Sequence, residues 1–82
     1  MKDVTYTRAA IRVLRRMPAN IAGRIETKVS EYAANPAVQA NNVTALKGRE
    51  AVRLRVGDWR VIMHDGVVLT ILEIGPRGGI YD

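Results

Sequence analysis

The sequence predicts an α+β fold in which an N-terminal strand and a helical hairpin precede an antiparallel sheet. Up to residue 35, apolar residues recur at α-helical spacing in two successive segments. After residue 51, apolar and polar residues alternate, which is the period of a β-strand. Two dipeptides typical of tight turns, Gly57-Asp58 and Asp65-Gly66, divide this second part. The expected order is β-α-α-β-β-β, with both helices packed on one face of the sheet.

The composition is that of a single small folded domain over residues 1–82. The chain is 48% hydrophobic, enough to build a core of modest size. It contains no cysteine and one histidine, so we expect neither a disulfide nor a metal site, and no cofactor. No apolar run has the length of a signal peptide or of the roughly 20 residues that span a membrane. We therefore expect a cytoplasmic protein that does not enter the membrane.

The first expected elements are a short strand at Asp3–Tyr6 and a helix over residues 8–17. Between them, the Thr7 hydroxyl can accept a hydrogen bond from an unpaired backbone N–H of the first helical turn. The helix is amphipathic, because its apolar residues share one stripe and its arginines lie largely off it. The stripe consists of Ala10, Ile11, Leu14 and Met17.

Pro18 separates this helix from a second one. Proline is tolerated at the first helical position but not in the helix interior, so Pro18 is expected to open the second helix. That helix ends at Asn35-Pro36, because the residue before a proline avoids helical geometry. Its apolar stripe consists of Ile21, Ile25, Val29, Tyr32 and Ala33. Two short amphipathic helices joined by a tight turn form an αα-hairpin.

A loop and then a strand with two distinct faces follow the helices. Residues Ala37–Leu46 have weak periodicity, which predicts a loop. In the strand Val52–Val56, the apolar residues are expected to face the helices, while Arg53 and Arg55 face away.

Two further strands complete the expected sheet, one at Trp59–His64 and one from Val67 to the Gly75-Pro76 dipeptide. The first of them is expected to direct Trp59, Val61 and Met63 toward the helices and Arg60, Ile62 and His64 away from them. The apolar run that begins at Val67 predicts an interior strand covered on much of both faces.

Arginine gives the chain most of its charge. The net charge is +5, and the sequence contains ten arginines and three lysines. A sheet face that carries Arg53, Arg55 and Arg60, with Arg77 just beyond the third strand, repels itself unless a polyanion neutralises it. A guanidinium group is suited to binding a polyanion because it contacts phosphate in a planar, bidentate manner. Charge alone leaves open a nucleic acid, another polyanion or an acidic protein as the partner. A structural alternative for Arg60 is an ion pair with Asp58, Glu73 or Glu50.

Three motifs in order resemble the RelE/ParE superfamily of toxins from bacterial toxin-antitoxin pairs. They are LKG at residues 46–48, R-x-R-x-G-D-W-R-V at residues 53–61 and G-x-R-x-x-x-Y at residues 75–81. The resemblance covers nearly the whole chain. It implies a cognate antitoxin as partner, and contact with operator DNA only through the antitoxin complex.

The superfamily contains two activities, and the resemblance leaves both open. RelE-like members are ribosome-dependent endoribonucleases that cut mRNA without a metal, whereas ParE-like members inhibit DNA gyrase by binding it. In the RelE-like pattern Arg60 and Arg77 stabilise phosphate charge, and Tyr81 stacks on the RNA or activates it. All three are present, so a metal-independent endoribonuclease acting on mRNA and the ribosome is the leading hypothesis. Gyrase inhibition is the second hypothesis, and a RelE-fold binding protein without catalytic activity is the third hypothesis.

The general base is an open question. Lysines of the best-known RelE pattern are replaced here by Ala51 and Arg53, and arginine keeps its proton. The candidates are Tyr81, if neighbouring guanidiniums lower its pKa, and His64, because imidazole titrates near neutrality. The residues expected to bind the RNA backbone are Lys47, Arg49, Arg53 and Arg55.

Overall fold

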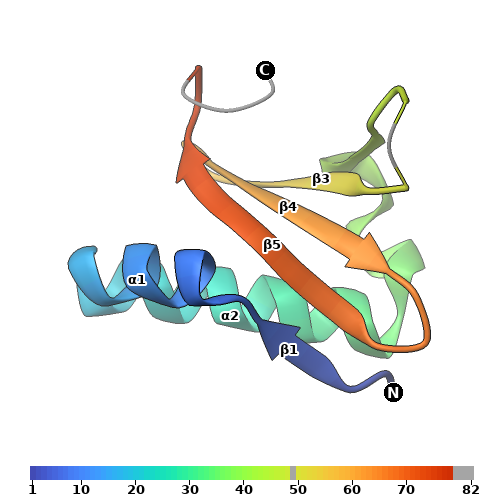
Figure 1. Ribbon diagram of the computed structural model, residues 1–82, viewed down its shortest axis with the longest axis horizontal. Helices are drawn as coiled ribbons and strands as arrows, with labels where there is room; N and C mark the ends of the chain where they lie inside the picture. Colours follow the sequence, from blue (N-terminus) through green and yellow to red (C-terminus); the bar gives the residue numbers. More distant parts are fainter. Residues whose placement is uncertain (49, 79–82) are drawn as a thin grey trace.

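Two helices cover one face of a five-stranded sheet in the computed structural model, which describes residues 1–48 and 50–78 (Figure 1). The strand order across the sheet is β1-β5-β4-β3-β2, with β1 parallel to β5 and the other pairs antiparallel. The elements are β1 (Val4–Tyr6), α1 (Arg8–Arg16), α2 (Ala19–Ala34), the 3-10 helix η1 (Pro36–Asn42), β2 (Val43–Ala45), β3 (Val52–Val56), β4 (Trp59–Asp65) and β5 (Leu69–Pro76). The predicted fold is confirmed.

Thr7 joins the start of α1 to the sheet. Its hydroxyl oxygen accepts a hydrogen bond from the Ala10 N–H at 3.2 Å, which confirms the predicted N-cap. The same hydroxyl donates to the Leu72 carbonyl at 2.8 Å, and the Thr7 N–H donates to the Ile71 carbonyl at 3.0 Å. One residue therefore ends β1, begins α1 and attaches both to β5.

The second helix has the predicted ends. Pro18 occupies its N-cap with φ −55°, and α2 stops at Ala34, just before the Asn35-Pro36 dipeptide. The Asn35 side chain then accepts a hydrogen bond from the Ala37 N–H, so it caps η1. In the described part of the chain, neither helix combines the length and the apolar character that crossing a bilayer requires.

The expected loop after α2 is instead ordered as η1 and β2. Strand β2 pairs antiparallel with β3, with Ala45 opposite Val52, so it forms one edge of the sheet. Three residues, Val-Thr-Ala, are too few to show alternation, which explains why the sequence pattern does not reveal this strand. Within η1, Gln39 is 1% exposed although it is polar.

Two apolar residues lie farther from the core than the pattern predicts. Ile11 is 36% exposed, and Val13 packs against the core from α1 instead. Val67 is 95% exposed, because the connection after Asp65 spans three residues and β5 starts at Leu69. The strand is interior as predicted, since it lies between β1 and β4.

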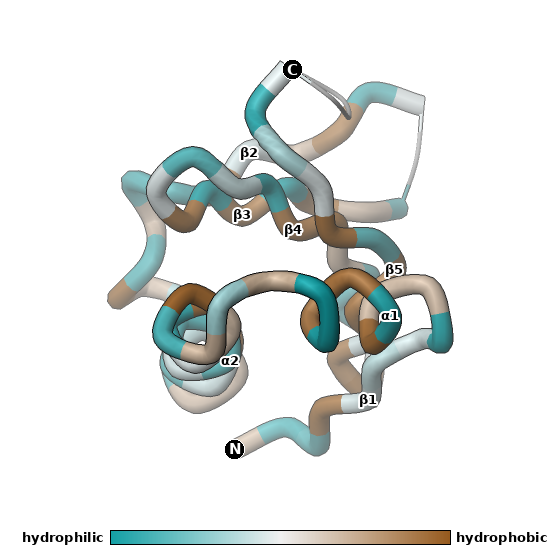
Figure 2. The backbone as a smooth tube through the Cα atoms, turned by 90° about the vertical axis from the view of Figure 1, so that its left-hand side faces the viewer, coloured by the Kyte–Doolittle hydropathy of each residue, from teal (hydrophilic) through white to brown (hydrophobic). Residues whose placement is uncertain are grey.

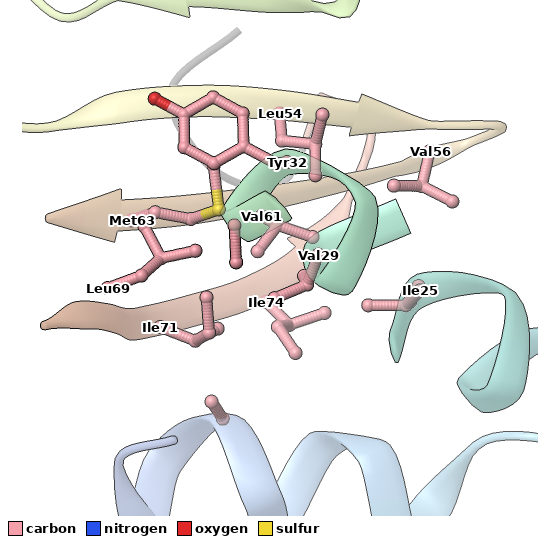
Figure 3. Close-up of a cluster of buried hydrophobic side chains, with 12 residues drawn as sticks. Ile25, Val29, Tyr32, Leu54, Val56, Val61, Met63, Leu69, Ile71 and Ile74 are labelled. Carbon is pink, nitrogen blue, oxygen red and sulfur yellow. The ribbon is translucent and has the colours of Figure 1, made fainter. Parts of the chain in front are cut away.

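The core lies between the helices and the near face of the sheet (Figure 3). Hydrophilic and hydrophobic residues alternate along β3 and β4, and the helices lie side by side beneath the strands (Figure 2). The predicted inward residues of the hairpin are in the core or packed against it, namely Val52, Leu54, Val56, Trp59, Val61 and Met63.

A bulge interrupts the pairing of β4 with β5. Ile62 is opposite Glu73, whereas the next residue, Met63, is opposite Ile71. Leu72 is thus an extra residue in β5. The Leu72 carbonyl accepts the hydrogen bond that the Thr7 hydroxyl donates.

A polar cluster holds the N-terminal segment against the far end of β4. The Tyr32 hydroxyl donates to the Asp65 carboxylate at 2.7 Å, and Lys2 forms an ion pair with the same carboxylate. The hydrogen bond from Lys2 is the main cause that lowers the pKa of Asp65. Burial, and then the hydrogen bond to Asp65, raise the pKa of Tyr32 to about 12.

The two pKa shifts define a pH window of stability. Because the Asp65 pKa is lowered from 3.8, its contribution is present above that value and is lost as the pH falls through the lower folded-state pKa. Because the Tyr32 pKa is raised from 10.0, its contribution is complete below pH 10.0 and is lost as the pH rises through about 12.

We predict that Tyr32→Phe lowers the free energy of unfolding by about 1.5 to 3 kcal/mol at neutral pH, the usual contribution of a hydrogen bond to a charged group. The difference from wild type should shrink in acid, as Asp65 becomes protonated. Urea denaturation at several pH values measures both effects. Tyr6→Phe is the matched control, because among the described residues the Tyr6 hydroxyl has no hydrogen-bond partner. An equal loss in both variants would contradict the role of the Tyr32–Asp65 contact.

Candidate anion-binding site

The face of the hairpin that points away from the helices carries arginines in register. Arg55 of β3 is directly opposite Arg60 of β4, and Arg53 is opposite Ile62. On the other side of β4, Arg60 is opposite Gly75, which has no side chain. Like charges placed directly opposite each other destabilise a sheet. The pairing of Arg55 with Arg60 therefore requires a compensating interaction, from the protein or from a bound anion.

Arg60 is 8% exposed, and its guanidinium folds back on the turn of its own hairpin. Its Nη1 donates to the carbonyls of Trp59 and Gly57 at 3.2 and 3.4 Å. The turn can present the Gly57 carbonyl in this way because Gly57 has φ +58°, a left-handed conformation that glycine adopts without strain. Backbone contacts thus hold this cation in a defined position.

Arg77 is attached to the same turn. Its N–H donates to the Asp58 carbonyl at 2.7 Å, so the segment after β5 runs beside the β3–β4 turn. From the other side, a guanidinium nitrogen of Arg24 in α2 lies 3.9 Å from the position that a Cβ on Gly57 would take. Basic residues from three separate parts of the chain therefore meet at this one turn.

These residues line a single hollow of about 490 Å³ at the end of the sheet. Its walls carry five basic side chains, Arg24, Lys28, Arg55, Arg60 and Arg77. Among the described residues that line it, the one carboxylate is that of Asp58. Five cations against one anion make the hollow strongly electropositive, and guanidinium forks match the oxygens of a phosphate. The arrangement is suited to bind an anion that carries several charges.

The other predicted site residues with described positions lie farther along the sheet. His64 is four residues beyond Arg60 in β4, roughly 13 Å away at the rise of a strand. Its Nε2 is 4.0 Å from the Glu50 carboxylate. Lys47 lies in the turn before β3, which the pairing of β2 with β3 places at the same end as His64. The structure thus brings Arg55, Arg60 and Arg77 together, leaves Arg53 beside them at mid-strand and separates His64 and Lys47 from them.

Two predicted site residues, Arg49 and Tyr81, lie outside the described residues. Conversely, Arg24 and Lys28 line the hollow although the sequence pattern does not mark them as part of a site. They stand four positions apart in α2, so they share one face of the helix. That spacing is the only signal that the sequence offers for them, because their approach to the β3–β4 turn depends on the packing of α2 on the sheet.

Residues 4–81 match the family described as the ParE toxin of the type II toxin-antitoxin system parDE. The chain belongs to this toxin family. The predicted membership of the RelE/ParE superfamily is thereby confirmed, and the protein is the toxin of a type II toxin-antitoxin system. Among curated protein sequences, none matches the chain.

Solved toxin structures share the fold. The archaeal RelE–RelB complex from Pyrococcus horikoshii matches with a TM-score of 0.78 and 25% identity, over 95% of this chain and 97% of that one. The intact Escherichia coli RelBE toxin-antitoxin complex matches with a TM-score of 0.74 and 16% identity, over 93% and 96% of the two chains. The isolated E. coli RelE toxin matches with a TM-score of 0.76 and 14% identity, over 94% and 85%.

We predict that pyrophosphate raises the melting temperature of the toxin, and that Arg77→Ala reduces this gain. A ligand that binds only the native state stabilises it by about 2.7 kcal/mol at 100 times its Kd. Thermal unfolding followed by circular dichroism, with and without pyrophosphate, measures the gain. Lys47→Ala is the control, because it removes an exposed cation at the opposite end of the hairpin. An equal gain in wild type and Arg77→Ala would place the anion elsewhere.

Proposed function

We propose that this toxin is a ribosome-dependent endoribonuclease that cuts mRNA without a metal and thereby blocks translation. The observation that carries the proposal is the hollow at the β3–β4 turn, where Arg55, Arg60 and Arg77 converge with two further cations of α2. A strand of RNA offers the successive phosphates that such a site suits. The fold shared with RelE structures is consistent with this activity.

The chemistry requires three functions. A base removes the proton of an RNA 2′-hydroxyl, whose oxygen attacks the adjacent phosphorus, and an acid protonates the departing 5′-oxygen. The products are a 2′,3′-cyclic phosphate and a free 5′-hydroxyl. The attack produces a five-coordinate phosphorane that carries more negative charge than the starting phosphate. Preorganised cations therefore stabilise the phosphorane more than they stabilise the substrate. We assign this third function to Arg60 and Arg77.

Arg60 is suited to this role because the turn fixes it before any ligand arrives. A guanidinium that already donates to two carbonyls reorganises little when charge develops beside it. Arg77 is bonded to the same turn through its N–H and lines the same hollow, so it supplies a second fork. Arg55 completes the wall on β3 and contacts the RNA backbone in this proposal.

Proton transfer is assigned to Tyr81 rather than to His64. Tyr81 follows Arg77 by four residues in the sequence, and a guanidinium placed beside its phenol would favour the phenolate by lowering the pKa. His64 lies roughly 13 Å along β4 from Arg60, beyond hydrogen-bond reach of a phosphate bound in the hollow.

Inhibition of DNA gyrase through protein binding is the second candidate function. The description of the matching family as the ParE toxin favours it. So does Ala51, which is 8% exposed and carries no group that transfers protons where the RelE-like pattern has a lysine. In that case the basic hollow would contact acidic groups of the target protein.

For the cognate antitoxin, we propose that an acidic, amphipathic segment docks on the outer face of α1. Four arginines and the exposed Ile11 line one hollow there, formed by Arg8, Ile11, Arg12, Arg15 and Arg16. An adjoining groove, which shares Ile11 and Arg15, is lined mainly by apolar residues such as Val4, Leu14 and Ala22, with Thr5 and Glu26 as its other polar residues. An apolar groove beside a row of cations is complementary to such a segment. Operator DNA would be contacted through the antitoxin of the resulting complex.

We predict that Arg60→Gln and Arg77→Ala each reduce cleavage of a programmed mRNA on purified ribosomes by at least about 100-fold, the usual loss when one charge-stabilising donor is removed. The measurement is primer extension on mRNA after incubation with toxin, with and without ribosomes and with EDTA in a parallel sample. His64→Gln should cut at close to the wild-type rate, because His64 lies away from the hollow.

Gyrase supercoiling is assayed with the same preparations. Inhibited supercoiling by a wild-type toxin that leaves mRNA intact would replace the nuclease proposal with the second candidate.

For the antitoxin, we predict that the double charge reversal Arg12→Glu/Arg15→Glu weakens binding at least about tenfold, since reversed charges repel an acidic partner. Isothermal titration with the cognate antitoxin gives the Kd. Raising the salt concentration should weaken wild-type binding more than binding by the variant. Lys47→Glu reverses a charge away from α1 and serves as the control. Unchanged affinity in the double variant would move the docking surface off α1.

A further inference from the structure

A chain of side-chain hydrogen bonds leads from the hollow into the protein and back. Arg55 Nη2 donates to Asn42 Oδ1 at 3.2 Å, Asn42 Nδ2 donates to Gln39 Oε1 at 3.1 Å, and Gln39 Nε2 donates to Glu31 Oε1 at 2.6 Å. Lys28 Nζ lies 3.5 Å from the same Glu31 oxygen. The chain thus joins β3 to α2 through two amides of η1.

The residues at the two ends of this chain determine which way each hydrogen bond between them runs. The guanidinium of Arg55 only donates hydrogen bonds, and the carboxylate of Glu31 only accepts them. Asn42 must therefore turn its oxygen toward Arg55, and Gln39 must turn its nitrogen toward Glu31. Each amide uses one donor and one acceptor, so a substitution at either residue interrupts the whole chain.

The middle of the chain is buried and hydrogen-bonded on both sides. Gln39 is 1% exposed, and because its amide oxygen and its amide nitrogen are both hydrogen-bonded, its buried polar atoms are satisfied. The Asn35 side chain caps the start of η1, and the Val43 N–H donates to the Ala40 carbonyl at its end. Asn42 is thus presented from a helix held at both ends, not from a free loop.

Arg55 needs such a support. It is exposed, and it stands directly opposite Arg60, which repels it. The Asn42 carbonyl draws its guanidinium toward η1, away from that like charge. Both Asn42 and Lys28 line the hollow together with Arg55, so the chain also connects two of the cations on its walls.

We propose that Gln39 and Asn42 are positioning residues that hold Arg55 at the wall of the anion-binding hollow. The proposal rests on the proposed function for its RNA ligand, while the support of Arg55 itself does not depend on that ligand. Asn42 acts through Arg55, and Gln39 acts through Asn42.

The test compares Asn42→Leu with Asn41→Leu in the full 82-residue chain. Asn41 is the adjacent, exposed residue of η1, and among the described residues its side chain has no hydrogen-bond partner, so it is a matched control. The probe is a single-stranded RNA with 2′-O-methyl groups, which blocks cleavage, and fluorescence anisotropy gives its Kd. Asn42→Leu should weaken binding about threefold to tenfold, the equivalent of one hydrogen bond.

The same substitution in an Arg55→Ala background should cause no further loss, because Asn42 acts only through Arg55. An equal loss with and without Arg55 would overturn the proposal. Gln39→Met, which keeps the length of the side chain, should weaken binding in the same direction.

Nitrogen-15 NMR of the Arg55 guanidinium in the free toxin provides a readout without RNA. Wild type and Asn41→Leu should show hindered rotation of the guanidinium and slow exchange of its Nη hydrogens, and Asn42→Leu should lose both. Unchanged Arg55 signals in Asn42→Leu would also overturn the proposal. If wild type neither binds nor cuts RNA, the proposed function fails, and the NMR comparison still decides whether Gln39 and Asn42 position Arg55.

Discussion

Burial of one side of the β3–β4 hairpin against the helices constrains the rest of the molecule. Leu54, Val56, Val61 and Met63 all lie in the core, and burying each such side chain contributes about 1.5 to 3 kcal/mol. Because side chains alternate along a strand, this burial forces Arg55 and Arg60 to share the other face. Their mutual repulsion is on the order of 1 to 4 kcal/mol near a surface, so the packing prevails. The concentration of charge is thus a consequence of the core.

Periodicity carries most of the information about the fold, and it does so only for elements long enough to show it. The stripes of α1 and α2 and the alternation of Val52–Val56 predict the helices, the hairpin and the inward face of its strands, whereas the stripe of α1 wrongly includes Ile11 in place of Val13. Strand β2 is three residues long and has no such pattern. Its position is set by its pairing with β3. Such a contact between separate segments cannot be read from the local pattern of apolar residues.

The sequence likewise predicts one part of the candidate site and misses another. Alternation places Arg53, Arg55 and Arg60 on one face, but it does not say where along the sheet a ligand would sit. The structure concentrates the cations at the Gly57-Asp58 turn, which leaves His64 at the other end of β4. Arg24 and Lys28 join the site only because α2 crosses beneath that turn. Such convergence depends on the angle between helix and sheet, which residue spacing does not encode.

The extra residue at Leu72 has an effect on the chemistry of this face. If Leu72 instead paired regularly opposite Ile62, continuing from Met63 opposite Ile71, the residue opposite Val61 would be Glu73 and the residue opposite Arg60 would be Ile74. A carboxylate would then point into the core, and a branched hydrocarbon would stand beside the buried guanidinium. With the bulge, Ile74 returns to the core and Gly75 takes the place next to Arg60. The bulge therefore sets the frame of β5 beyond Leu72, and regular pairing of the unchanged sequence would alter the core and the site at once.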